Sequence, residues 1–309
     1  MAKSCAALKR EYSMRNPVKP MGEKLIFSGV GENDVYNIAS PLRTSDGLVI
    51  PGRVEPRADG LASVIRFFER RNERYELLED VASLPLQDPF HACIQGFLVV
   101  GGVYVHKDAQ GELTGWETRF YRGIDIRSLS LFAKGPQNMK DIRLVELQDG
   151  RVGVFTRPHG LPDARAKIGY LEVETLAQLT PEIMEQAILL DDLFLPEEWG
   201  GANEIHLLED GRLGVLGHIS CQTGTDTLHY HAMAFVFDPV TRTYTEPMII
   251  ADRACFPEGP AKEARLWDVV FTGGMIRNND GTATLYVGIS DAEAAKVEIP
   301  DPFCVNHPG

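Results

Sequence analysis

Asp88 is the residue in this sequence best placed to act as an acid, because it stands at the start of an apolar run that continues to Val105. The run mixes alternating with continuous apolar residues and is punctuated by Gly96, Gly101 and Gly102. This pattern is typical of two short strands joined by a turn and buried on both faces. Pro89 disfavours helical geometry for the residue before it, so we expect an extended Asp88. Its carboxylate would lie at the edge of a core, where it acts in catalysis or caps a turn.

Other polar residues also stand beside apolar, strand-like residues, and they are spread along the whole sequence. They occupy positions 34–37, 52–55, 87–89, 140–143, 157–158, 203–204, 218, 229–231 and 290–291. Most of them carry carboxylate, amide, guanidinium or imidazole groups, which together would form a polar binding site. Such a site requires a fold that brings these separate segments to one place.

Turns that contain glycine indicate hairpins at intervals along the chain. They fall at Asp46-Gly47, Gln110-Gly111, Asp149-Gly150, Asp210-Gly211 and Asp280-Gly281. Glycine accepts the positive φ that these turns require. Two of the hairpins, at 147–155 and 208–216, resemble each other closely in sequence.

Hairpin-based repetition near 60 residues is typical of the blades of a β-propeller. Dividing 309 residues by five gives about 62 residues per blade. We therefore predict an all-β, five-bladed β-propeller that forms one domain over residues 1–309, with short extensions at both ends. Six or seven blades of about 40 to 50 residues would also fit the length, but the hairpin spacing favours five. The loops at one end of the innermost strands would then converge on a central channel.

Little helix and little disorder are expected. The best helix candidate covers 180–190, where Thr180 is suited to the N-cap and Pro181 to the first helical position. Disorder is expected only at the chain ends, and the tail after Asp301 is expected to lie across the surface.

The order of several motifs resembles that of the mannoside phosphorylases of glycoside hydrolase family 130. The motifs are Asp-Val-Tyr-Asn at 34–37, Gly-Arg-Val-Glu-x-Arg at 52–57, Asp-Pro at 88–89, Lys-Asp-x-Arg-Leu at 140–144, Arg-Pro at 157–158, Trp-Asp-Val-Val-Phe-Thr-Gly-Gly at 267–274 and Tyr-Val-Gly-Ile-Ser-Asp at 286–291. The chain resembles still more closely a sister group, the β-1,2-mannosyltransferase/phosphorylases of glycosyltransferase family 108. The resemblance runs from about Asn33 to Asp291.

This resemblance implies a five-bladed β-propeller and inverting transfer of a β-mannosyl unit. Phosphate would attack the anomeric carbon of a β-1,2-linked mannoside and release α-mannose 1-phosphate, or the reaction would run in reverse. Because phosphate is the nucleophile, one acid is sufficient and no second carboxylate has to activate water. Asp88 matches the proton donor, which acts either directly or through a sugar hydroxyl. No cofactor is implied, and inorganic phosphate is the co-substrate.

The resemblance also assigns binding roles. Asn37, Arg53, Asp141 and Asp291 match positions that hold the mannosyl ring, and such side chains suit sugar hydroxyls. The expected phosphate pocket matches Arg143, Arg157 and His218, with Tyr230 or a flanking histidine in its last corner. Guanidinium groups bind phosphate through planar, two-point hydrogen bonds. Without the resemblance, Arg143 and Arg157 would also fit ordinary ion pairs at strand ends.

Alternative functions remain open at this stage. A hydrolase on the same scaffold would need a base about 6.5 to 9.5 Å from Asp88, and Glu204 and Asp34 are the candidates. A non-catalytic propeller that binds a partner protein would instead expose an apolar patch. His229 and His231 alternate along a predicted strand and could be two metal ligands, but no third ligand stands at a convincing spacing, and we predict no metal site.

Composition limits the partners. The formal net charge is −13, and no stripe of lysine and arginine suits a nucleic-acid backbone. Five scattered cysteines without a Cys-x-x-Cys motif are typical of a reducing compartment and speak against a zinc knuckle. The N-terminal apolar run is too short for a secretory signal, and no run of about 18 apolar residues exists. We expect a cytoplasmic protein that does not bind membranes and that could form a homo-oligomer.

Overall fold

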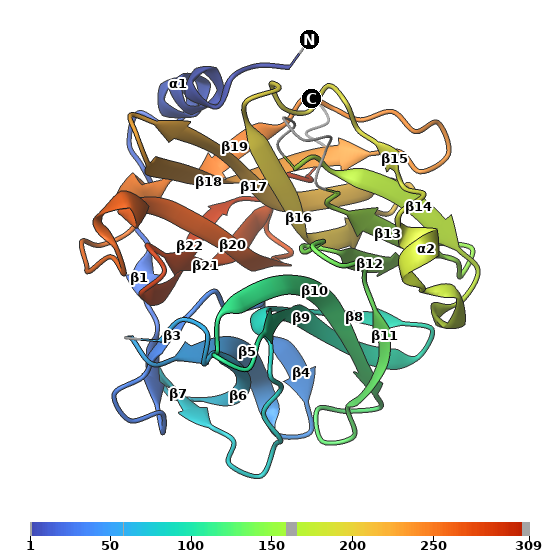
Figure 1. The fold of residues 1–309 in the computed structure, drawn as a ribbon. Helices are drawn as coiled ribbons and strands as arrows, with labels where there is room; N and C mark the ends of the chain where they lie inside the picture. Colours follow the sequence, from blue (N-terminus) through green and yellow to red (C-terminus); the bar gives the residue numbers. More distant parts are fainter. Residues whose placement is uncertain (1, 58, 159–165, 305–309) are drawn as a thin grey trace.

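The structure is a computed structural model that describes residues 2–57, 59–158 and 166–304 (Figure 1). Within these residues, four β-sheets make up most of the regular structure, and helices are few and short. The prediction of a mostly β protein is confirmed.

The first sheet contains six strands and is drawn in blue and cyan in Figure 1. Its strands are β2 (Ile26–Ser28), β3 (Asp34–Tyr36), β4 (Leu42–Thr44), β5 (Gly47–Glu55), β6 (Val64–Arg71) and β7 (Arg74–Leu77). They lie in the order β2-β7-β6-β5-β3, and β4 pairs with β5. The predicted turn at Asp46-Gly47 joins β4 to β5.

The second and third sheets each contain four strands in chain order. The second consists of β8 (Gln87–Ile94), β9 (Phe97–Lys107), β10 (Leu113–Gly123) and β11 (Ser130–Lys134). The third consists of β12 (Arg143–Glu146), β13 (Val152–Thr156), β14 (Gly169–Val173) and β15 (Ile188–Leu189). All neighbouring strands in both sheets are antiparallel.

The largest sheet has eight strands. They are β16 (Trp199–Leu207), β17 (Leu213–Thr223), β18 (Thr227–Phe237), β19 (Met248–Ala251), β20 (Asp268–Arg277), β21 (Thr282–Ile289), β22 (Glu293–Pro300) and β1 (Glu23–Lys24). Two antiparallel meanders, β16 to β19 and β20 to β22 with β1, make up this sheet. Among the residues that the structure describes, the strand pairing that joins them is the short parallel one at His229↔Asp268 and Tyr230↔Val269.

The sheets are arranged around a common centre, as in a propeller (Figure 1). Strand β8 contacts β5 of the first sheet and β12 of the third, β12 contacts β16, and β16 contacts β20. The circle closes where β21 and β22 contact β3. Loops before or after these strands therefore meet at the middle of the molecule.

The apolar run after Asp88 forms β8 and β9, as predicted. Its turn is Gln95-Gly96, and φ is positive at both residues (51° and 80°), as a two-residue hairpin requires. Glycines allow β8 to lie close to β9, because a Cβ on Gly101 would come within 2.4 Å of Phe90 and one on Gly102 within 2.4 Å of Gln87 O. The prediction of an extended Asp88 is wrong: its φ is +51°, because the strand bulges between Gln87 and Phe90.

The two similar hairpins occupy equivalent places in neighbouring sheets. Asp149-Gly150 joins β12 to β13, and Asp210-Gly211 joins β16 to β17. In each turn the glycine has a φ of 84°, and the aspartate accepts a hydrogen bond from the backbone N–H of the arginine two residues later, at 3.1 Å. The repeat in the sequence is therefore a structural repeat.

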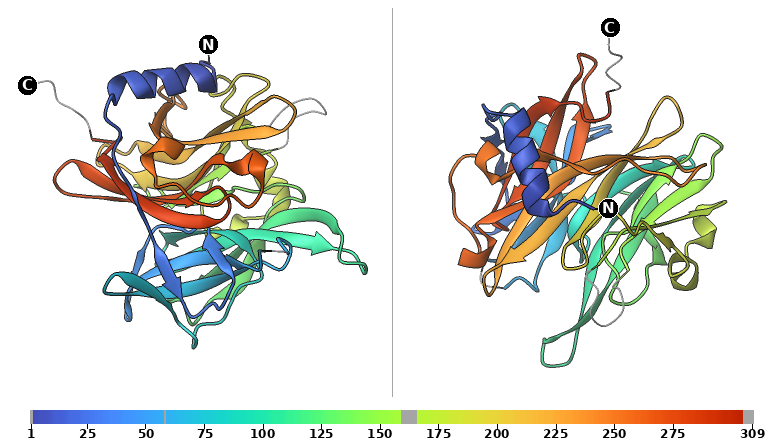
Figure 2. Two further views of the ribbon diagram at one scale, coloured as in Figure 1. Left: turned by 90° about the vertical axis from the view of Figure 1, so that its left-hand side faces the viewer. Right: turned by 90° about the horizontal axis from the view of Figure 1, so that it is seen from above.

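The helices differ from the predictions. Helix α1 (Cys5–Arg15) was not predicted, although Ser4 caps it and Cys5, Leu8 and Tyr12 form its buried face. It packs against β17 and β19 and lies on the opposite side of the molecule from the first sheet (Figure 2). The predicted helix at 180–190 is only α2 (Pro181–Met184), because Ile188–Leu189 pairs with β14 instead. Three 3₁₀ turns cover Leu176–Gln178, Arg253–Cys255 and Ala264–Leu266.

The described part of the N-terminal extension is thus ordered by helix α1 rather than disordered. In the C-terminal extension, Phe303 is buried against the core, and residues 305–309 lie outside the described residues. Among the described residues, no helix has both the length and the apolar character needed to cross a membrane.

Candidate active site

A pocket of about 260 Å³, here called the Asp88 pocket, lies where the sheets meet. It is lined by five of the predicted site residues, which are Asn37, Arg53, Asp88, Tyr230 and Asp291. Its wall also contains residues that the sequence analysis did not assign, including Lys140, Lys262, Arg265 and Phe271. The fold therefore brings together side chains that are up to 254 positions apart in the sequence, from Asn37 to Asp291.

The Asp88 carboxylate is held in place by two donors from the first sheet. Its Oδ1 accepts hydrogen bonds from Asn37 Nδ2 at 2.9 Å and from Arg53 Nη1 at 3.1 Å. The residue is 9% exposed and lines the pocket. This geometry fixes the direction in which the carboxyl group can exchange a proton.

The backbone at the site is unusual. Asn37, Asp88, Asp141 and Asp291 have positive φ values of 43°, 51°, 58° and 50°. Asparagine and aspartate tolerate this left-handed conformation better than other residues with a Cβ. Such conformations cost free energy and cluster at functional sites. Here they occur where strands of different sheets begin or end, and they turn polar side chains towards the centre.

Arg53 and Lys262 are both bound by Glu55. Arg53 Nη2 lies 2.5 Å from Glu55 Oε2, and Lys262 forms an ion pair with Glu55 Oε1. Burial tends to raise the pKa of Glu55, but the charge of Arg53 and the hydrogen bond from Lys262 outweigh it, so the pKa is lowered. Glu55 is therefore a carboxylate that fixes two cations of the pocket wall.

Asp291 differs from Glu55 in its proton affinity. Burial raises the pKa of Asp291, and the negative charge of Asp88 raises it further, while Arg53 and Lys262 act in the opposite direction. Of the carboxyl groups that line the pocket, Asp88 and Asp291 act on each other, and Asp291 binds a proton more readily than a free aspartate.

Four predicted residues lie behind the pocket wall, in what we call the buried charge cluster: Asp141, Arg143, Arg157 and His218. Arg157 Nη1 lies 2.8 Å from Asp141 Oδ2, and Arg143 Nη2 lies 3.8 Å from Asp141 Oδ1. The His218 ring lies between Tyr230 and Phe271, with both pairs of ring centroids 5.4 Å apart. Because Tyr230 and Phe271 line the Asp88 pocket, the His218 ring stands directly behind them.

The protonation of the cluster follows from its burial and its cations. Burial tends to raise the pKa of Asp141, but Arg157, Lys140 and Arg143 outweigh it and lower the pKa. Burial lowers the pKa of His218 to about 3, assisted by Arg157 and Lys140. The imidazole is therefore neutral at pH 7. Its Nδ1 donates to Asn203 Oδ1 at 2.8 Å, which leaves a lone pair on Nε2.

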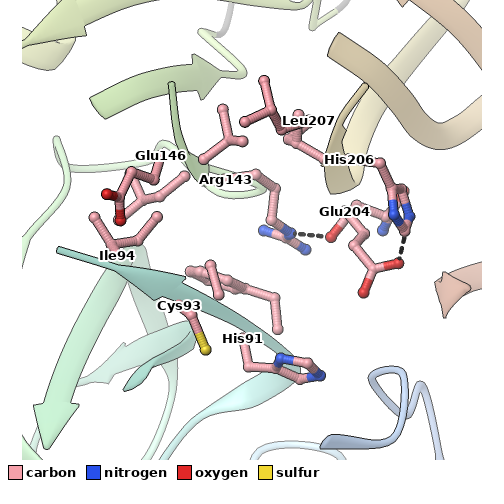
Figure 3. Close-up of a pocket in the computed structure, with 14 residues that line it drawn as sticks. His91, Cys93, Ile94, Arg143, Glu146, Glu204, His206 and Leu207 are labelled. Atoms are coloured by element: carbon pink, nitrogen blue, oxygen red, sulfur yellow. Dashed lines mark hydrogen bonds and ion pairs between the residues drawn. The ribbon is translucent and has the colours of Figure 1, made fainter. Parts of the chain in front are cut away.

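A second pocket, here called the His91 pocket, has a volume of about 310 Å³ (Figure 3). It lies between the later parts of β8 and β16, at 90–94 and 203–207, and the whole of β12, at 143–146. Arg143 lines this pocket and not the Asp88 pocket, and its Nε donates to Asn203 O at 2.7 Å. Arg143 thus belongs both to the His91 pocket and, through Asp141, to the buried charge cluster.

Glu204 is the central acid of the His91 pocket. Its carboxylate accepts from Ser40 Oγ and, at 2.6 Å, from Met275 N, and it lies 2.9 Å from His206 Nε2. Burial tends to raise the pKa of Glu204, but the neighbouring His206 and the other partners outweigh it and lower the pKa. Both carboxylate oxygens are therefore satisfied.

This arrangement corrects the alternative in which Glu204 or Asp34 activates water beside Asp88. Glu204 lines the His91 pocket, and Asp34 forms an exposed ion pair with Arg57 at 2.6 Å. Neither residue lines the Asp88 pocket. The sequence placed both beside strands, but it does not show which end of the central channel each side chain reaches.

The histidine pair at 229 and 231 takes part in other contacts. His229 Nδ1 lies 2.6 Å from Asp268 Oδ2, and His231 is buried. In the part of the chain that the structure describes, no three side chains of the metal-binding types are grouped closely enough to hold an ion.

Sequence reasoning found most of the polar residues but missed Lys262 and Arg265. They lie in the segment between β19 and β20, where the described regular structure is two short 3₁₀ turns and no strand pattern marks the positions. Lys140 was within a recognised motif, and its position next to Asp141 was the available signal.

Comparison with known proteins identifies relatives of this chain. Residues 13–305 match the model of a family described as "Protein of unknown function (DUF1861)". No curated protein matches the chain. Among solved structures, MPT-4, a mannose phosphorylase from Leishmania mexicana in complex with phosphate ion, is 35% identical. The match covers 96% of this chain and 94% of that one, with a TM-score of 0.88.

Two further solved structures are similar to this chain. MPT-1, a GDP-Man-dependent mannosyltransferase from Leishmania mexicana, is 34% identical over 98% of this chain and 96% of that one, with a TM-score of 0.89. A β-1,2-mannobiose phosphorylase from Listeria innocua is 14% identical over 92% of each chain, with a TM-score of 0.63, and shares the fold. This chain therefore belongs to the DUF1861 family and to the same family as the Leishmania mannose phosphorylase and mannosyltransferase.

Proposed function

We propose that this protein is an inverting β-1,2-mannoside phosphorylase/mannosyltransferase that acts in the Asp88 pocket. A phosphate oxygen attacks the anomeric carbon of a terminal β-1,2-linked mannosyl unit. The bond from that carbon to the bridging oxygen breaks, and the bridging oxygen takes a proton. The products are α-mannose 1-phosphate and a saccharide shortened by one unit, and the reverse reaction extends the acceptor.

The observation that carries this proposal is the setting of Asp88. A single carboxyl group is held by Asn37 and Arg53 in a pocket that stands in front of a buried cluster of guanidinium groups. An acid beside an anion site is what phosphorolysis requires, because phosphate replaces the water that a hydrolase would activate. Asp88 gives its proton to the leaving oxygen, directly or through a sugar hydroxyl.

The mannosyl ring is proposed to bind along the wall formed by Asn37, Arg53 and Asp291. All three line the pocket and offer donors or acceptors to ring hydroxyls. Asp141 lies behind the wall and is bound to Arg157, so we assign it the role of orienting that guanidinium group. This assignment differs from the direct sugar contact that the sequence comparison implied.

The phosphate is proposed to bind between Tyr230 and the buried charge cluster. Trp199 Nε1 donates to the Tyr230 hydroxyl at 3.1 Å, which leaves the hydroxyl proton available to an anion. Arg157 and His218 stand behind this position, and Arg143 acts through Asp141. The phosphate complex of the 35%-identical Leishmania phosphorylase supports an anion site in this family.

We further propose that residues 1–309 form one five-bladed propeller. Dividing the eight-stranded sheet at its two-residue parallel pairing gives two meanders, which with the other three sheets make five. The contacts that run from β5 through β8, β12, β16 and β20 support this count.

The donor could also be a nucleotide sugar, since the mannosyltransferase relative uses GDP-mannose and is 34% identical. Hydrolysis is less well supported. Neither Glu204 nor Asp34, the two candidate bases, lines the Asp88 pocket.

The test is to incubate the protein with mannose and either α-mannose 1-phosphate or GDP-mannose, and to measure β-mannoside and released phosphate or GDP. Asp88→Asn is the matched control, since it keeps the shape and removes the acid. We expect product from α-mannose 1-phosphate with the wild-type protein alone. Product from neither donor would contradict the proposal, and so would release of free mannose from β-1,2-mannobiose, in a separate incubation, that does not depend on phosphate.

A further inference from the structure

Two of the five cysteines meet where helix α1 packs on the largest sheet. Cys5 is the first residue of α1, and Cys221 lies near the end of β17, one of the strands against which the helix packs. The two thiols are in hydrogen-bonding contact with each other. Cys5 belongs to the main apolar cluster of the core, and Cys221 packs against that cluster. The fold thus brings together two thiols that no local motif connects in the sequence.

The start of helix α1 is held firmly, so the position of Cys5 beside β17 is fixed. The backbone N–H of Cys5 donates to both carboxylate oxygens of Glu198, at 2.8 and 3.0 Å, and Ser4 caps the helix. One turn later, Lys9 Nζ lies 3.2 Å from Asp268 Oδ2 of β20. The contact between the thiols is therefore part of an ordered interface.

The two thiols differ in exposure and in acidity. Cys221 is partly exposed and is followed by exposed residues at 222–223, whereas Cys5 is 1% exposed. The hydrogen bond from Cys5 lowers the pKa of Cys221, and the charge of Lys9 acts in the same direction. Burial and Glu198 oppose this shift but are outweighed. The same hydrogen bond, together with burial, raises the pKa of Cys5. Cys221 is therefore the thiol that more readily becomes a thiolate, which is the reactive form.

We propose that Cys221 and Cys5 form a reversible redox pair that hydrogen peroxide or another hydroperoxide converts to a disulfide. The Cys221 thiolate attacks one oxygen of the peroxide, and the O–O bond breaks. Cys221 becomes a sulfenic acid, and the other oxygen takes a proton and leaves as water or as an alcohol. The Cys5 sulfur then attacks the Cys221 sulfur, the S–O bond breaks, and the Cys5 proton leaves with that oxygen as water. Two thiols are thus oxidised and one peroxide is reduced, and an added thiol reverses the change by exchange.

The surroundings of Cys5 suit it to the second step. While Cys221 is a thiolate, its negative charge and the shared hydrogen bond raise the pKa of Cys5. Oxidation of Cys221 removes that charge, and Lys9 continues to favour a thiolate at Cys5. The disulfide joins α1 covalently to β17. Because Lys9 of the same helix pairs with Asp268 of β20, the bond clamps α1 over the place where the two meanders of the largest sheet meet.

Cys255 is a contrasting cysteine at the same helix. It is buried, its sulfur lies 3.0 Å from the Tyr12 hydroxyl oxygen, and burial raises its pKa. A thiol of this kind behaves as a small apolar side chain and stays reduced. A transient disulfide between Cys5 and Cys221 also agrees with the reducing compartment expected from the sequence, because disulfides in such compartments are usually catalytic or redox-sensing.

The test treats the reduced protein with a small excess of hydrogen peroxide, blocks the remaining thiols and maps the tryptic peptides by mass spectrometry. Cys5 falls in the peptide 4–9 and Cys221 in the peptide 213–242. We expect these two peptides to be joined, with a mass two hydrogen atoms below their sum, and to separate again after treatment with dithiothreitol. Cys93→Ser is the matched control, because it removes an exposed cysteine and should leave the joined peptide unchanged.

Two variants separate the steps. In Cys5→Ser, peroxide should leave a sulfenic acid on Cys221 that dimedone traps, and in Cys221→Ser the thiol of Cys5 should stay reduced. In the wild-type protein, the disulfide should raise the midpoint of thermal unfolding by roughly 3–6 °C, because it closes a long loop. Cys221→Ser should show no such rise after peroxide treatment.

The proposal is overturned if the peptides 4–9 and 213–242 stay separate while the exposed Cys93 is oxidised. It is also overturned if they join only between two molecules, which a non-reducing gel would show as a dimer. An unchanged unfolding midpoint in the oxidised wild-type protein would contradict the clamp on α1. Should Cys5→Ser or Cys221→Ser not fold, the peptide maps of the wild-type protein and of Cys93→Ser decide, because both proteins keep the pair.

Discussion

The Asp88 pocket and the His91 pocket are both lined by residues of β8, but they differ in backbone conformation and in charge. Two residues of the Asp88 pocket wall have positive φ besides Asp88 itself, and a lysine is unpaired among the described residues. In the His91 pocket no lining residue has positive φ, and the two oxygens of Glu204 have three partners.

This difference indicates that the Asp88 pocket keeps destabilising features because they serve function. Strained backbone and incompletely paired charge lower the stability of a fold and persist where they have another role. A satisfied acid such as Glu204 is instead expected in a part that only holds strands together. The comparison can be tested by changing one group in each pocket and measuring activity and stability separately.

The largest effect is expected for Asp88→Asn. The amide has nearly the same shape as the carboxyl group but no acidic proton, and loss of a general acid lowers the rate by about 10²- to 10⁴-fold. Initial rates of phosphorolysis and a thermal unfolding curve would be measured together. A variant that folds normally and turns over like wild type would show that Asp88 is structural.

A smaller effect on rate is expected for Arg157→Ala, with a loss of stability. Removing this guanidinium leaves Asp141 without its closest partner, and breaking a buried ion pair costs about 3–5 kcal/mol. The dependence of the initial rate on phosphate concentration should weaken far more than the binding of the mannoside. Arg157→Lys should restore this dependence only in part, because an ammonium group cannot make the two-point contact of a guanidinium group. Initial rate against phosphate concentration for both variants is the measurement. A rate that stays indifferent to phosphate in the wild-type protein would support hydrolysis instead.

Glu204→Gln should separate the two pockets. The change keeps the shape of the side chain but removes the charge that faces His206, so the free energy of unfolding should fall by about 1–3 kcal/mol. Since the pKa of Glu204 is lowered in the fold, this carboxylate stabilises the protein above its unfolded pKa, and the loss should vanish as pH falls through the folded pKa. Catalytic rate at 25 °C should stay within about 2-fold of wild type. A rate loss like that of Asp88→Asn would end the distinction between the pockets.

The smallest effect, of opposite sign, is expected for Asp291→Asn. The raised pKa of Asp291 means that the folded protein binds this proton more tightly than the unfolded chain. The ionised group therefore costs stability at neutral pH, and this cost disappears below the unfolded pKa of about 3.9. Asp291→Asn should raise the melting temperature at pH 7 and have little effect near pH 3.5. A lower melting temperature at pH 7 would contradict the electrostatic account.

Local signals in the sequence were sufficient for the hairpins, since Asp149-Gly150 and Asp210-Gly211 determine their own turns. The same kind of signal was present for helix α1, because Ser4 marks its N-cap and the spacing of Cys5, Leu8 and Tyr12 marks a buried face. A helix this short is marginal on its own, however, so its sequence could not be distinguished from that of a disordered terminus without the sheet against which the helix packs.

The sequence predicted which residue types form the site, but not which of them line the pocket and which are buried behind it. Motif order identified Arg143 and Arg157, yet both are buried beside Asp141, because the side of a strand end that faces a pocket depends on bulges and left-handed residues. The extended geometry expected for Asp88 failed for the same reason: Pro89 disfavours a right-handed helical conformation before it, but a bulge allowed a left-handed one. Lys262 depends on where an irregular segment folds back, which no local pattern encodes.

The contact between the first and last sheets, which closes the circle, has a consequence for the order in which the protein folds and becomes active. There the chain passes so close to itself that a Cβ on Gly288 of β21 would lie 2.0 Å from Asn37 Oδ1, which belongs to the segment after β3. Asn37 in turn donates to Asp88, so the acid is oriented by a residue that is seated only when the last sheet has docked on the first. In a refolding experiment, activity should therefore appear after the circular dichroism signal of the strands is complete. Its appearance would report the docking of the last sheet on the first.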